Sequence, residues 1–324
     1  MAAWLARRLA TAALTLAVAL TALFALMRAA PGDPLAQLTD DRPLPPEARD
    51  ALRRRYGLDQ PLPRQFLAFA AGALRGDLGV SIQYGRPVRD LLAERLGATL
   101  LLAGTALLVN ATLGIWLGAR QAFAAGSAID AALGTLATAS YALPPFVLAV
   151  LAAGLFGVRL GWFPAAGARD PLLAADTGAL ALVLDRLRHL ALPALVLSAS
   201  TLGGTMRQQR AALLDALGRP FVRAARARGL DERRVRWGHA WRASLVPVLT
   251  HFGLWLPALV TGSVFVEAVF AWPGIGELAA AATAARDYPL VMGAALLAGA
   301  GVVLGSVVAE WAARLADPRG ADAP

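Results

Sequence analysis

The sequence predicts an all-α integral membrane protein with six transmembrane helices, and three observations support that class. The 324 residues are 57% hydrophobic and only 16% charged, with a mean hydropathy of +0.55, which lies outside the usual composition of soluble domains. Six runs are apolar over roughly the 20 residues that a helix needs to cross a bilayer. The arginines are concentrated in the flanks on one side of these runs.

The six apolar runs are 9–27, 98–119, 131–156, 190–206, 246–270 and 290–313. The first could be a secretory signal peptide, but it is longer than the usual apolar core of such a peptide and five runs follow it. We therefore interpret it as a retained span. No low-complexity linker or internal repeat divides the chain, so 1–324 is interpreted as one transmembrane domain.

Arginines in the short flanks predict the orientation of the chain. Fifteen lie on the side of the termini and five on the other, and basic residues favour the cytoplasmic side. Both termini and the loop 207–242 are therefore predicted to be cytoplasmic. The segment 28–97 lies outside, and its helix-period apolar residues punctuated by Pro and Gly predict a long outer loop with short helices.

Composition also excludes several functions. Every basic residue is Arg, and the absence of Lys removes the P-loop and Schiff-base lysines. The absence of Cys removes thiol chemistry, and the three histidines lack metal-ligand spacing. We expect no enzyme and no cofactor in this chain. The net charge of +9 suits anionic lipid or a cytoplasmic protein better than nucleic acid, because the arginines lie between apolar runs.

The loop 207–242 holds ten of the 31 basic residues. It predicts a short helix from Phe221, a left-handed corner at Gly229, and a second helix capped by Asp231 that leads into the fifth span. Such a corner could transmit a push to a transmembrane helix. Composition alone also fits a loop that only sets topology and binds anionic lipid.

This corner resembles the loop by which permeases of ATP-binding-cassette importers contact their ATPase. The general pattern of that loop is E-A-A, three residues, G, nine residues, I-x-L-P. The E, A, A and G positions hold Arg223, Ala224, Ala225 and Gly229. The I, L and P positions hold His239, Trp241 and Arg242. Only the alanines and the glycine match.

The match is closer to the dipeptide and oligopeptide importer permeases, whose loop resembles "ARARGL" and "HA-R-LVPV". Further fragments resemble the same branch in the same order: "PGDP" at 31–34, "RRRYGLDQPLPRQF" at 53–66, "RGDLGVSI" at 75–82, "GRPVRDLLAERLGATL" at 85–100, "TGSVFVEAVFAWPGIGEL" at 261–278 and "RDYPLVMG" at 286–293. The resemblance covers essentially the whole chain.

The resemblance implies a permease of the bacterial inner membrane that forms the path for peptides or a related small solute. It implies a second related permease chain, two ATPase subunits that bind the ATP, and a solute-binding protein outside. The ATPase-docking residues would be Arg223, Ala224, Ala225, Arg226, Arg228, Gly229 and Leu230.

A second group of candidate residues lies near the outer ends of the spans. Glu267 near the outer end of the fifth span could contact substrate or a gate, or it could have a structural role as a hydrogen-bond partner or cap. Pro273 and Gly274 predict a tight turn that is either a connector or a contact surface. In the second run, Asn110 is expected to make an interhelical hydrogen bond. An ion-coupled secondary transporter is the alternative function, but the charged mid-membrane relay it requires is not evident in the sequence.

Overall fold

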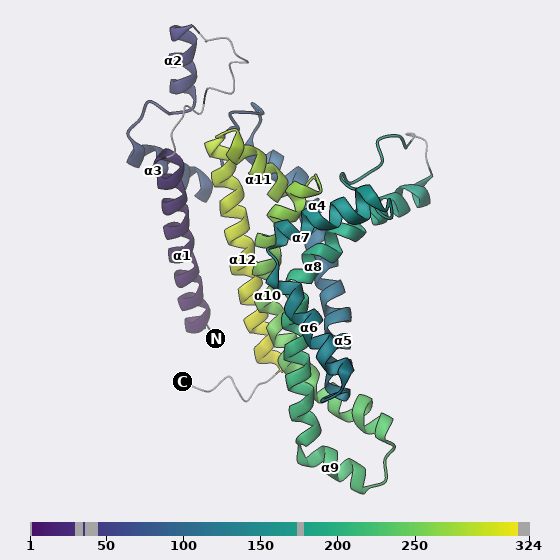
Figure 1. The fold of residues 1–324 in the computed structure, drawn as a ribbon. Helices are drawn as coiled ribbons and strands as arrows, with labels where there is room; N and C mark the ends of the chain where they lie inside the picture. The colour runs from purple at the N-terminus through teal and green to yellow at the C-terminus, as the bar shows by residue number, and fades with distance from the viewer. Residues whose placement is uncertain (1, 30–34, 36–44, 174–177, 317–324) are drawn as a thin grey trace. The chain divides into compact units, whose positions relative to one another are not determined.

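The computed structural model describes residues 2–29, 35, 45–173 and 178–316, so the "PGDP" fragment lies largely outside the described residues. Within these ranges the regular elements are helices, and one isolated antiparallel bridge joins Val80 to Pro87 (Figure 1). The helices form two compact units. Unit 1 comprises residues 1–99 with 273–301, and unit 2 comprises residues 100–272 with 302–324.

Unit 1 contains the helices of both ends of the chain. They are α1 (Ala2–Ala29), α2 (Pro46–Arg55), α3 (Leu62–Leu74), the first part of α4 (Val88–Val109), α11 (Ile275–Ala284) and the first part of α12 (Tyr288–Ala316). Helices α2 and α3 each carry a proline in the first turn, where its missing N–H breaks no hydrogen bond. They confirm the short helices predicted for the segment 28–97.

The core of unit 1 forms where α4, α11 and α12 meet. Val88, Leu92, Leu278 and Leu290 are among its buried side chains. A buried carboxylate ties the preceding loop to this core: Asp287 caps α12 by accepting from Leu290 N at 3.2 Å, and it also accepts from Gln83 N at 3.0 Å and from Ser81 Oγ. The "RGDLGVSI" and "RDYPLVMG" fragments therefore share one hydrogen-bond network.

Unit 2 is built around α8 (Ala179–Gly218), which packs against α5, α6, α7 and α10. The unit also contains the rest of α4, the π-helical segment Asn110–Gly114, α5 (Ile115–Phe123), α6 (Ala128–Ala142), α7 (Pro145–Ala152), the π-helical segment Ala153–Arg159, α9 (Pro220–Ala227), the π-helical segment Arg234–Ala240, α10 (Trp241–Val269) and the rest of α12.

Glycines bring the backbones of these helices into direct contact with α8. A Cβ on Gly118 of α5 would lie 2.6 Å from the carbonyl oxygen of Met206, and a Cβ on Gly203 of α8 would lie 1.9 Å from that of Ala137. Small residues are the usual means of close helix packing in membranes. The predicted interhelical hydrogen bond of Asn110 is confirmed, since its Nδ2 donates to Thr201 Oγ1 at 2.7 Å.

Three helices of the described residues are long and apolar enough to cross a membrane: Ala10–Ala29, Val88–Phe123 and Tyr288–Val307. A fourth candidate is the pair Ala128–Ala142 and Pro145–Arg159, which is bent by 103°. The predicted third span, 131–156, is therefore not one continuous helix. Pro144 and Pro145 explain the break, because a proline disfavours helical geometry at the residue before it. The predicted run 190–206 lies within α8, and the predicted run 246–270 lies within α10 up to the last residue of that helix, Val269.

Candidate functional site

The predicted glycine corner follows α9. Gly229 has φ +77°, its N–H donates to the carbonyl of Arg226 at 2.9 Å, and the N–H of Leu230 donates to the carbonyl of Ala225 at 3.4 Å. These two bonds form a Schellman motif, which closes a helix with a left-handed residue. No atom lies within 4 Å of the position of a Cβ on Gly229. The position therefore favours glycine for its backbone conformation and not for lack of space.

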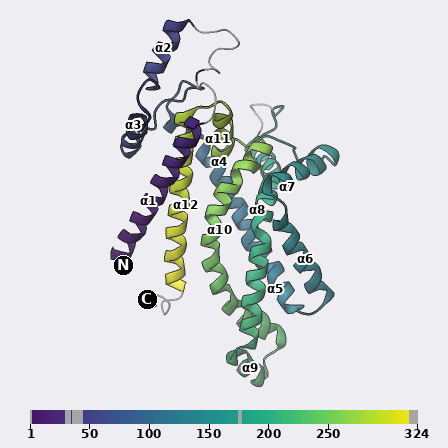
Figure 2. The same cartoon turned by 60° about the vertical axis from the view of Figure 1, so that its left-hand side comes forward.

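The second helix begins where the sequence predicts. Asp231 Oδ2 accepts from Arg233 N at 3.0 Å, and the Asp231 carbonyl accepts from Val235 N at 2.9 Å, so Asp231 is the N-cap. The helix continues through the π-helical segment Arg234–Ala240 directly into α10. No loop separates the corner from the helix that contains the fifth apolar run. We call residues 220–240 the arginine corner (Figures 1 and 2, at the end of α8).

Small apolar side chains fix the arginine corner to the rest of unit 2. Val222, Ala225, Val235 and Ala240 are buried in one cluster with residues of α5 and α8. The residues of α5 and α8 in this cluster are Ala119, Ala122, Leu213 and Ala216.

Aromatic rings close the side of this cluster. The ring centroid of Trp237 lies 5.0 Å from that of Phe123 and 5.8 Å from that of Trp241. Trp241, which departs from the family pattern, is therefore part of the packing. Because α9 and the second helix share these contacts, the corner is one packed element with α5 and α8.

The opposite face of α9 is exposed. Phe221, Ala224 and Arg228 lie at i, i+3 and i+7, which places them on one side of the helix, and Phe221 is 40% exposed. Ala224 and Arg228 are predicted docking residues, and of the remaining ones Arg223, Arg226 and Gly229 are exposed and Leu230 is partly buried. Ala225 is 1% exposed and faces the protein interior, so its part in the corner is packing.

An acidic residue that the sequence reasoning missed bridges the corner. Glu232 accepts from Arg226 Nη2 at 2.8 Å and Nε at 3.1 Å, and from Arg236 Nε at 3.1 Å. These hydrogen bonds lower the pKa of Glu232 to about 2, and the bond from Arg226 makes the largest contribution. The i, i+4 pair with Arg236 could have been predicted from spacing. The pair with Arg226 could not, because it depends on how the corner folds.

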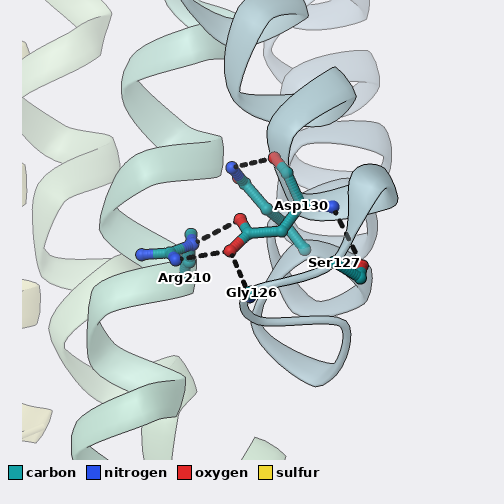
Figure 3. A network of polar contacts seen from close by, with 5 residues as sticks. Gly126, Ser127, Asp130 and Arg210 are labelled. Carbon is teal, nitrogen blue, oxygen red and sulfur yellow. Dashed lines mark hydrogen bonds and ion pairs between the residues drawn. The ribbon is translucent and has the colours of Figure 1, made fainter.

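A second missed network holds the α5–α6 turn to α8 (Figure 3). The Asp130 carboxylate accepts from Arg210 Nε at 2.9 Å and Nη2 at 2.7 Å, and from Gly126 N at 3.0 Å. The Oγ of Ser127 accepts from Asp130 N at 3.4 Å and caps α6. Bidentate arginine–carboxylate pairs are the most directional of ion pairs. This network fixes α8 just before α9.

The residues proposed for the outer face are distributed over both units. Glu267 is fully buried near the end of α10 in unit 2. Pro273 and Gly274 belong to unit 1, where Gly274 caps α11 and its carbonyl accepts from Leu278 N at 3.2 Å. A left-handed residue precedes this turn: Ala271, with φ +47°, follows the end of α10 and comes before the proline and glycine that predicted the turn.

Comparisons with known proteins agree with the resemblance along the whole chain. Residues 110–321 match the family described as "Binding-protein-dependent transport system inner membrane component", and residues 1–103 match the N-terminal region of such membrane components. A putative peptide permease protein of Brucella suis biovar 1 (strain 1330) is 39% identical over 305 residues, which cover 93% of this chain and 94% of the relative.

Two further relatives carry more specific names. The oligopeptide transport system permease protein AppB of Bacillus subtilis (strain 168) is 35% identical over 297 residues, 91% of this chain and 92% of its own. The di/tripeptide transport system permease protein DppB of Pseudomonas aeruginosa (strain UCBPP-PA14) is 37% identical over 308 residues, with the same coverage. With both family regions matched in order, this chain belongs to the binding-protein-dependent transport system inner membrane components, the permease subunits of ATP-binding-cassette importers.

Proposed function

We propose that the arginine corner is the surface on which the ATPase of the importer docks. The observation that carries this proposal is the division of α9 into two faces. Val222 and Ala225 anchor it to unit 2, whereas Phe221, Ala224 and Arg228 point away from the protein. An exposed aromatic side chain beside small and cationic residues suits a protein partner, because aromatic and arginine side chains dominate binding energy in interfaces.

The docking corner would pass movement of the ATPase to the membrane helices. The second helix continues without interruption into α10, and the buried side of the corner packs against α5 and α8. Glu232 braces the turn between the two helices. When ATP binding and hydrolysis close and open the ATPase, α9 would move with it and rock these helices between outward-facing and inward-facing states. A loop that only sets topology needs neither brace nor exposed aromatic residue.

The proposed topology has six spans in one domain, 1–324, with both termini and the arginine corner cytoplasmic and the segment 28–97 outside. The bent pair α6–α7 is the third span, and α8 and α10 contain the fourth and fifth. The chain has no Cys, so Asp231→Cys and Asp59→Cys variants each carry a single thiol. A membrane-impermeant maleimide added outside should label position 59 and leave position 231 unlabelled. Labelling of position 231 and not of position 59 would show that the chain has the opposite orientation.

The proposed cargo is a peptide or a related small solute, because the relatives above carry the names of peptide permeases. The assembly would contain a second related permease chain, two ATPase subunits and a solute-binding protein outside. The isolated permease should not hydrolyse ATP, since it has no lysine to contact the phosphates. Vesicles holding the full assembly should take up labelled peptide only with ATP inside and binding protein outside. Uptake without the ATPase, or ATP hydrolysis by the purified permease above a detergent blank, would contradict the proposal.

A further inference from the structure

Two cavities of unit 1 meet at Arg28, in the last turn of α1. The first, of about 280 Å³, lies between α3 and the start of α12, with Phe69 and Met292 in its walls. The second, of about 430 Å³, lies along α1 and is lined by Thr21, Ala25, Leu62, Pro63 and Phe66. Phe24 and Arg28 belong to both linings. The guanidinium therefore lies where a mixed cavity joins an apolar one.

Neutral groups surround the Arg28 guanidinium. Its carbon lies 4.4 Å from the ring centroid of Tyr288 and 5.4 Å from that of Phe24, and Nη2 donates to Gln65 Oε1. Gln65 is itself held, because its Nε2 donates to the carbonyl of Gln60 at 2.6 Å. The Nε atom of Arg28 is buried and has no hydrogen-bond partner among the described residues.

The charge in this region is not neutralised by the cavity walls. Arg64 also lines the first cavity, and Asp77 is the one carboxylate among its lining residues. Asp77 Oδ1 accepts from Gly79 N at 2.9 Å, and no ion pair found among the described residues joins a carboxylate to Arg28. A partly buried guanidinium with a free N–H favours an anion that can accept two hydrogen bonds.

We propose that this junction binds a membrane phospholipid, with the phosphodiester at Arg28 and an acyl chain in the apolar cavity along α1. The phosphate supplies the negative charge that the neutral groups around the guanidinium do not provide. The apolar cavity suits the chain, because its walls on α1 belong to the candidate membrane span Ala10–Ala29. The lipid would come from the leaflet that meets the C-terminal end of α1.

The structure favours a lipid over a free anion. Inorganic phosphate would occupy only the cationic junction and leave the 430 Å³ cavity beside it empty of apolar contacts. A hydrocarbon without a head would fill that cavity and leave Arg28 unpaired. Only a ligand with both parts meets both features. Bound in this way, it would connect α1, α3 and α12 within unit 1.

Protection of a single thiol in the full chain tests this site. Ala29 lines the second cavity beside Arg28 and is exposed, and the sequence has no Cys, so Ala29→Cys provides a unique label. In maltoside micelles, dioleoyl phosphatidylglycerol should slow the reaction of this thiol with maleimide. Dioleoylglycerol, which can enter the apolar cavity but leaves Arg28 unpaired, and inorganic phosphate should each protect the thiol only at much higher concentration. Equal protection by either of these two compounds, or no protection by the phospholipid, would overturn the proposal.

Charge variants in the Ala29→Cys background test the role of the guanidinium. Arg28→Gln should raise the phospholipid concentration for half-protection about tenfold, the equivalent of one lost charge-assisted contact, and Arg28→Lys should have a smaller effect. Arg7→Gln is the matched control, because Arg7 is an exposed arginine at the other end of α1. Unchanged half-protection in a folded Arg28→Gln protein would refute the assignment. If that variant does not fold, the comparison of phospholipid with dioleoylglycerol still decides.

Discussion

Gly229→Val is the sharpest test of the arginine corner. Gly229 has φ +77°, and no atom lies within 4 Å of the place that a Cβ would take, so the substitution introduces backbone strain without a clash. The left-handed region costs a residue with a side chain about 1–2 kcal/mol of conformational free energy. The cost for a β-branched residue such as Val lies at the upper end of this range. A cost of about 2 kcal/mol corresponds to roughly a thirtyfold shift in the equilibrium between formed and unformed corner.

The assay is capture of the ATPase subunits by the tagged permease, together with ATP-dependent uptake in vesicles. Membrane levels should stay near those of the wild type, because the apolar spans are unchanged. Capture should weaken strongly and uptake should be lost. Gly229→Asn should be milder, because Asn tolerates the left-handed region better than other residues with a side chain.

Gly57→Val is the matched control. Gly57 also closes a helix in a Schellman motif, with φ +64° and open space at its Cβ position, but it lies in the segment 28–97, which the proposed topology places outside. The same backbone strain there should leave ATPase capture intact. If Gly229→Val binds its ATPase and transports normally, the arginine corner only anchors topology, and the lever mechanism is wrong.

The remaining predictions concern single side chains of the arginine corner and of the network on α8. Ala224→Asp should weaken ATPase capture at unchanged membrane level, since it adds a carboxylate to the exposed face, whereas Ala224→Ser should be nearly neutral. Glu232→Gln should speed hydrogen exchange in the corner at pH 7. Because the pKa of Glu232 is lowered to about 2, its contribution to the stability of the corner is complete above its ordinary pKa near 4.5 and is lost as pH falls towards 2. The exchange rates of wild type and variant should therefore become equal near pH 2. A difference between these rates that persists at low pH would contradict this prediction. Asp130→Asn should lower the melting temperature more than Asp215→Asn, because the Arg210 pair of Asp130 is less exposed than the surface pair of Asp215; equal losses would show that the network does not brace α8.

Local signals predicted much of the candidate site from the sequence. The left-handed residue after α9 and the N-cap after it depend on Gly229 and Asp231, whose side chains act within a few residues of themselves. The helical class and the short helices of the segment 28–97 follow from periodicity and from prolines in first turns. Even the polar contact of Asn110 was predictable, because an amide in an apolar span requires a partner.

Long-range contacts could not be predicted from the sequence. Asp130 and Arg210 are 80 residues apart, and Ser81 and Asp287 are 206 residues apart, so no spacing pattern connects them. The bend after α6 was missed for a different reason. The apolar run 131–156 is long enough for a span, and its average hydropathy does not reveal the break that the proline pair at its centre causes. The use of Ala271 in the left-handed region is equally invisible, because this residue type rarely adopts it.

The fold of the corner explains two of the three positions that match the family pattern. Ala225 is buried against unit 2 and Gly229 has a positive φ, so the fold restricts both residues and both match. Arg223 departs from the pattern and is exposed, so the fold does not restrict it. Among the described residues, neither Arg223 nor Arg228 forms an ion pair. We therefore expect the ATPase of this importer to carry carboxylates opposite these two arginines, and charge reversal at Arg223 should be rescued only by a reversal in that ATPase.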